Sequence, residues 1–417
     1  MKREQQALLM KMQLGDIKNG ARSRQRHRNV GYELYAGIGE IISKWSKQDM
    51  QVAAKSLCLT RSKSFDIFRK NLFPKDFDSI HAGYFIKKEC SCEKLFIWYA
   101  CLINQYVTVI NKYISLRNQF EKAFIVGNYS EASTIIAKVE SEFGLSVWGI
   151  DCRFAVYEYE GGLEANKAFL EKIVSSKANV FIKYCANFQS FKVEKNVNNR
   201  QYVHRIENVF EDASSDVAAF FRELLYPIQN LEDEDAKGIL RLSLSLPLID
   251  IYNAFIKTCI RLVASRNNQY REILQQSFNI IEGVDDVVFQ KLKWAICGSY
   301  KQFNLSENDI NLYTIGDLYT RGDYDKVIKK IDETEMLGNC FELYEYYVKS
   351  HIMANKELNI SNGNSIRNQL ICAMYSAYVK QKDVEQAHFI ITNSTFPPIK
   401  LMQMLELSSK KCNKLLY

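Results

Sequence analysis

Cysteine and histidine are the residue types best suited to hold a metal ion, but their spacing here does not favour a metal site. Eleven cysteines and five histidines are scattered along the 417 residues. Cys90 and Cys92 form the one close pair, and the nearest histidine is His81. A structural zinc ion needs four ligands, which usually come as two closely spaced pairs. We therefore expect ordinary buried thiols in a reducing compartment, with no metal and no cofactor.

The local motifs of common catalytic sites are missing. The sequence has no phosphate-binding loop ending in Gly-Lys-Ser/Thr, no Gly-x-Ser-x-Gly elbow and no His-Glu-x-x-His helix. Gly37 and Gly39 lack the third glycine of a dinucleotide-binding loop. Asp285 and Asp286 would need a distant histidine for catalysis, and such pairs are more typical of helix starts. We expect no enzymatic activity; an active site assembled from distant residues is the alternative.

Positive charge is concentrated in a basic N-terminal arm, residues 1–30. Within residues 1–28, eight lysines or arginines stand against Glu4 and Asp16, so about +6 of the formal net charge of +7 lies there. The arm's candidate phosphate-binding residues are Lys18, Arg22, Arg24, Arg26 and Arg28. Such side chains bind nucleic acids with an affinity that falls as salt rises. A solvated tail, or a dock for an acidic protein surface, fits the same charge.

The rest of the chain has the periodicity of helices. Proline, which breaks helix interiors, is absent between Lys75 and Tyr226. Apolar residues recur three and four apart over 32–45, and we expect further helices over 50–58, 64–72 and 93–116. No segment alternates apolar and polar residues as a strand does. The sequence therefore predicts an all-α fold.

Two features bear on location. Glu4 and Asp16 interrupt the first 20 residues, which does not fit a secretory signal peptide. The most apolar window, 95–110, contains Asn104 and Gln105 and is too short to span a bilayer. We predict a soluble, cytoplasmic protein with no membrane partner.

Four segments share a helix end, a short polar turn and a second amphipathic helix. Their turns are centred on Gly127, Gly161, Gly322 and Lys382. A glycine here is expected to close the first helix in the left-handed conformation. An aromatic residue follows two positions after Gly127 and Gly322, and Ala132 would let the second helix approach the first closely. This is the pattern of an antiparallel helical hairpin.

These turns resemble the tetratricopeptide repeat, in a divergent, bacterial-type form. Gly127 and Gly161 are 34 residues apart, which is that family's period. The sequence departs from the family where small residues are usual, at Phe120, Asn166 and Val327. The resemblance covers about 113–180 and 308–398 and implies an α-solenoid of stacked helical hairpins. An irregular helical bundle is the alternative.

The length also shapes the expected organisation, because single hydrophobic cores stop growing at roughly 250–300 residues. We divide the chain into the arm, an N-terminal helical region, a first set of hairpins, a helical middle region and a second set of hairpins. Their bounds are 1–30, 31–112, 113–200, 201–307 and 308–417.

The resemblance implies a concave groove that takes a peptide or a helix. The family's groove positions fall on Arg117, Glu121, Phe124, Trp148, Asp151, Glu158 and Tyr159. We therefore predict a non-catalytic scaffold, a subunit or regulator of a multiprotein complex. The alternative is a nucleic-acid-binding accessory protein that uses the arm. Residues 120–148 also resemble bacterial helical-repeat proteins, some of which occur beside phage-defence genes, so this alternative extends to phage defence.

Overall fold

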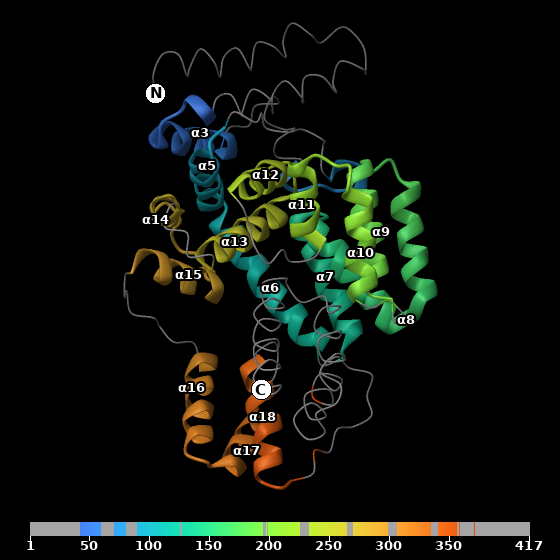
Figure 1. Cartoon of the computed structure of the whole chain (residues 1–417), viewed down its shortest axis with the longest axis vertical. Coiled ribbons are helices and arrows are strands. Elements are labelled where there is room, and N and C mark those ends of the chain that lie inside the picture. Colours follow the sequence, from blue (N-terminus) through green and yellow to red (C-terminus); the bar gives the residue numbers. More distant parts are fainter. Residues whose placement is uncertain are drawn as a thin grey trace, which may run out of the picture.

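The computed structural model is helical throughout the residues that it describes (Figure 1). These residues are 42–59, 71–80, 90–125, 127–194, 197, 199–225, 233–264, 270–298, 307–334, 341–356, 358 and 371. No strand occurs among them, so the expected all-α class is confirmed. Over the same ranges, no helix combines the length and the apolar character needed to cross a membrane.

The helical elements with defined bounds lie between Lys47 and Met353. In chain order they are α3 (Lys47–Leu59), the 3₁₀ turn η2 (Phe77–Ser79), α5 (Cys92–Gln105), α6 (Val107–Ile125), α7 (Tyr129–Phe143), α8 (Val147–Ser175), α9 (Val180–Lys192), α10 (Asn199–Phe210), α11 (Ser215–Leu225), α12 (Asp233–Ser243), α13 (Leu248–Ala264), α14 (Arg271–Phe278), α15 (Val287–Cys297), α16 (Glu307–Thr320), α17 (Tyr324–Thr334) and α18 (Phe341–Met353).

The single helix expected over 93–116 is wrong, because the chain forms α5 and α6 with a break at Tyr106. Tyr106 has φ −114° and ψ 19°, outside the helical range. Asn104 and Asn111 flank the break, and each accepts a hydrogen bond from a backbone N–H of the loop 279–286, at 3.0 and 2.9 Å. The polar residues that interrupt the apolar run therefore hold a distant loop.

Two of the predicted turn glycines are confirmed. Gly127, between α6 and α7, has φ 85°, and Gly322, between α16 and α17, has φ 80°. After the first turn, Asn128 caps α7 and the ring of Tyr129 packs against Phe124 at 5.5 Å. The turn expected around Gly161 is also present, because non-helical Gly162 (φ 71°, ψ −166°) divides α8 into two helical parts; the glycine with positive φ is Gly162 and not Gly161. The segment around Lys382 lies outside the described residues.

Helix α13 is central to the packing. It contacts α5, α6, α8, α12 and α15, and Figure 1 shows it running through the middle of these helices. Helices α16, α17 and α18 pack on one another and lie at the end of the molecule opposite α3. The side chains of Ile251, Tyr252, Phe255 and Cys259 on α13 are fully buried.

Asp250, in the first turn of α13, holds the start of α8. Its two carboxylate oxygens accept hydrogen bonds from the backbone N–H groups of Val147 and Trp148, at 2.8 and 3.0 Å. A negative charge is favourable at a helix N-terminus, where backbone N–H groups lack partners within the helix. Burial nevertheless raises the pKa of Asp250 to about 6, and the two hydrogen bonds oppose that rise.

Gly144 joins α7 to α8 under a tight steric constraint. It has φ 81° and ψ 178°, a conformation that side-chain-bearing residues rarely adopt. The next residue, Leu145, donates its N–H to the Pro74 carbonyl oxygen at 2.8 Å. A Cβ atom on Gly144 would overlap that same oxygen. The segment before η2 is thus locked against the α7–α8 connection.

We expect Gly144→Ala to destabilise the protein more than Gly162→Ala. Both glycines have positive φ, so alanine at either costs about 1–3 kcal/mol in backbone strain. A Cβ at Gly162 meets nothing within 4 Å, whereas one at Gly144 meets the Pro74 backbone, which adds about 1–3 kcal/mol. Urea unfolding of both variants measures the difference; equal losses would contradict the proposed contact.

The raised pKa of Asp250 predicts a pH-dependent free energy of unfolding. The folded state holds the proton more tightly than the unfolded chain, whose carboxyl has a pKa near 3.8. Protonation of Asp250 therefore stabilises the folded state fully below the unfolded-state pKa of 3.8, and this stabilisation is lost as the pH rises to about 6. Relative to Asp250→Asn, the wild type should lose about 2–3 kcal/mol of stability between pH 4 and pH 7. If urea unfolding shows the same difference in free energy between wild type and Asp250→Asn across this pH range, the pKa of Asp250 is not raised.

Candidate partner-binding site

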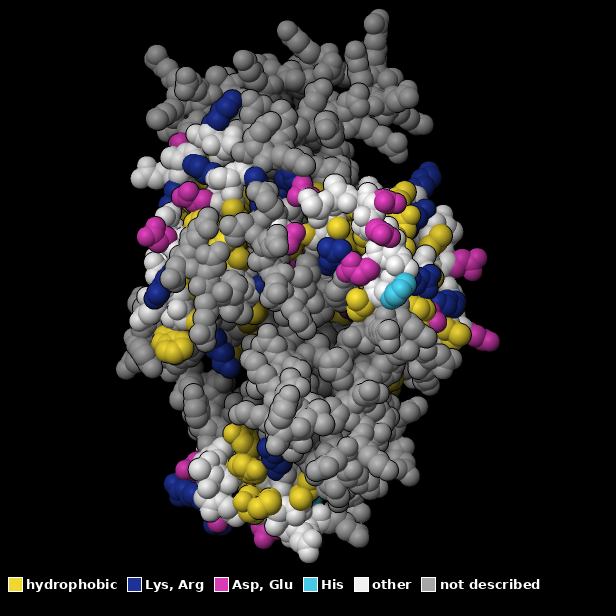
Figure 2. All heavy atoms as spheres, in the orientation of Figure 1, with side chains coloured by type: hydrophobic (Ala, Val, Ile, Leu, Met, Phe, Trp, Pro, Cys, Tyr) yellow, Lys and Arg dark blue, Asp and Glu magenta, His cyan; other side chains and the backbone are white. Residues whose placement is uncertain are grey.

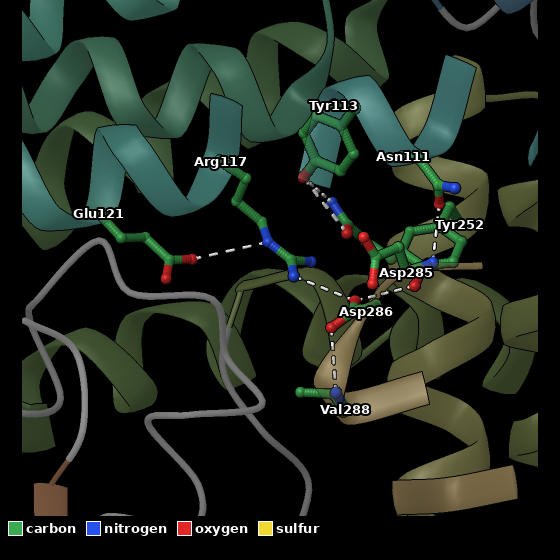
Figure 3. A network of polar contacts seen from close by, with 9 residues as sticks. Asn111, Tyr113, Arg117, Glu121, Tyr252, Asp285, Asp286 and Val288 are labelled. Carbon is green, nitrogen blue, oxygen red and sulfur yellow. Dashed lines mark hydrogen bonds and ion pairs between the residues drawn. The ribbon is translucent and has the colours of Figure 1, made fainter. Parts of the chain in front are cut away.

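A buried ion pair lies where α6, α13 and the start of α15 meet (Figure 3). The Nη2 of Arg117 donates to Oδ2 of Asp286 at 3.0 Å, and both side chains are almost fully buried. Tyr252 donates its hydroxyl to the same carboxylate oxygen at 2.8 Å. The other oxygen of Asp286 accepts from the Val288 N–H at 3.0 Å and so caps α15. One carboxylate therefore ties three helices together.

The network continues along α6 in both directions. One turn later, the Glu121 carboxylate lies 3.8 Å from Nε of Arg117. One turn earlier, the guanidinium lies over the Tyr113 ring, 5.8 Å from its centroid. The Tyr113 hydroxyl accepts a hydrogen bond from Nδ2 of Asn253 at 2.9 Å. A single face of α6 thus lies against the polar residues of α13.

The loop 279–286 is held in place to present Asp286. Asn111 donates to the Gly283 carbonyl oxygen at 2.8 Å, in addition to accepting from the loop. Gln290 and Lys293 of α15 donate to loop carbonyl oxygens at 2.6 and 2.8 Å. Gly283 adopts φ 75°, which glycine permits at no steric cost. The loop is bound from both sides, so Asp286 has little freedom to move.

The electrostatics of this site favour a fixed charge state. Desolvation opposes the charged form of Arg117, yet the Asp286 carboxylate overcomes it and raises the pKa of the guanidinium. Burial raises the pKa of Tyr252, and Asp286 raises it further. The phenol therefore stays protonated and donates. A protonated guanidinium and a neutral phenol around one carboxylate hold the helices together.

The predicted groove residues lie along α6 and α8, mostly facing the chain itself. The structure brings Arg117 and Glu121 into the buried network, and Glu158 accepts from the side chain of Asn166 at 2.8 Å inside α8. Asp151 is bound by Lys192 of α9 at 2.6 Å. These contacts occupy the polar groups that a partner would use.

The three predicted aromatic residues belong to one ring cluster between α6 and α8. Trp148 meets Phe120 edge-on at 5.8 Å, and Phe124 meets Tyr159 at 5.6 Å. Phe124 is buried, whereas Trp148 and Tyr159 keep some exposed surface. Contact of these residues with a partner remains a prediction. The five nucleic-acid candidates of the arm lie outside the described residues.

Large exposed apolar side chains also occur on the neighbouring helices α8, α9 and α10. Val180 is 65% exposed and Tyr184 is 46% exposed, one turn apart on α9. Val174 at the end of α8 and Val209 on α10 are similarly exposed, and the Tyr184 ring lies 6.3 Å from that of Phe210. We call Val174, Val180, Tyr184 and Val209 the outer patch. The sequence analysis missed it, although α9 is apolar on its outer face as well as on the face buried by Ile182, Cys185 and Phe188.

The thiols of Cys90 and Cys101 are poor nucleophiles. Burial raises the pKa of Cys90 to about 11 and that of Cys101 to about 12, so both stay protonated at neutral pH. Within the described ranges, no group of three or more His, Cys, Asp or Glu side chains is placed to hold a metal ion.

Comparison with protein families, with curated proteins and with solved structures finds no match for this chain.

We expect Arg117→Met to lower the free energy of unfolding by about 3 kcal/mol, because it leaves a buried carboxylate without its cation. Arg321→Met is the matched control. Its pair with Asp317 is also close, at 2.8 Å, but exposed, so the loss should stay within about 0.5 kcal/mol.

A double-mutant cycle tests whether the ion pair causes the loss. Arg117→Met combined with Asp286→Asn should cost less than the sum of the two single changes, as judged by chemical unfolding. Additive losses would show that the two residues stabilise the fold independently.

Proposed function

We propose that this protein is a non-catalytic helical scaffold that binds a protein partner through the outer patch. The observation that carries the proposal is the exposure of Val180 and Tyr184 on one face of α9. Exposed apolar groups gathered over neighbouring helices mark interaction sites more often than single exposed residues do. Tyrosine is also among the residues that contribute most to binding energy at protein interfaces.

The surroundings of the patch suit a protein partner. Figure 2 shows hydrophobic side chains mixed with charged ones over the region of α9 and α10. α8 and α10 also carry exposed polar side chains, among them Lys172, His204 and Arg205. An apolar centre with a polar rim is the usual anatomy of a protein interface. We infer that the partner presents an apolar face, such as that of an amphipathic helix.

The packing supports a tetratricopeptide-like stack as the finer description of the fold. Helices α6 and α7, α11 and α12, and α16 and α17 pack as consecutive pairs, α8 is divided into two helical parts at Gly162, and α7 packs on α8. Such stacks hold rigid surfaces on which partners dock without large rearrangement. A cytoplasmic setting, in which thiols stay reduced, belongs to the same proposal. Nucleic-acid binding through the arm stays a prediction from its charge.

The test is a comparison of partners retained from the native cell by tagged full-length protein. Val180→Asp places a charge in the outer patch and should remove the bound partner. Val52→Asp is the matched control, because Val52 is 45% exposed on α3, away from the patch. It should retain the partner. Quantitative mass spectrometry measures which proteins each of the two variants retains.

The two variants must unfold at similar temperatures for the comparison to hold, which a thermal melt checks. A protein lost with Val180→Asp and kept with Val52→Asp is the expected result. The same retained proteins with both variants, or none with the wild type, would show that the outer patch is not a binding surface.

A further inference from the structure

We draw no further inference here: the strongest candidate, the surface patch on α15 where Val287 and Trp294 are exposed, carries nothing because the described part of the structure does not show what covers it.

Discussion

The rest of the structure depends on the desolvation of polar side chains along α13. This helix carries Asp250, Asn253, Lys257 and Arg261 at spacings of three and four residues, which place them on one face. Other helices bury Asp250 and Arg261 on that face, and Asn253 and Lys257 are half-buried. Charges removed from water are costly unless partners reach them, so each side chain constrains the element that supplies its partner.

The partners come from different parts of the chain, which makes α13 the common reference for their positions. Asp250 fixes the start of α8, and Arg261 fixes α11 through Glu223. Tyr252 shares Asp286 with Arg117, which fixes α6 and α15 together. Apolar packing alone tolerates sliding of one helix along another, whereas these bonds are satisfied in only one arrangement. The polar face therefore selects one packing among several that would bury similar apolar area.

The features that could be predicted from the sequence are those determined by residues close together in the chain. The helical class and the turns at Gly127 and Gly322 follow from periodicity and from the need for positive φ. The burial of Arg117 could not be predicted, because its carboxylate partner lies 169 residues away. The repeat resemblance placed Arg117 in a groove, and charged residues are in any case mostly exposed. The break at Tyr106 escaped prediction for the same reason, since the loop that binds its neighbours is distant in sequence.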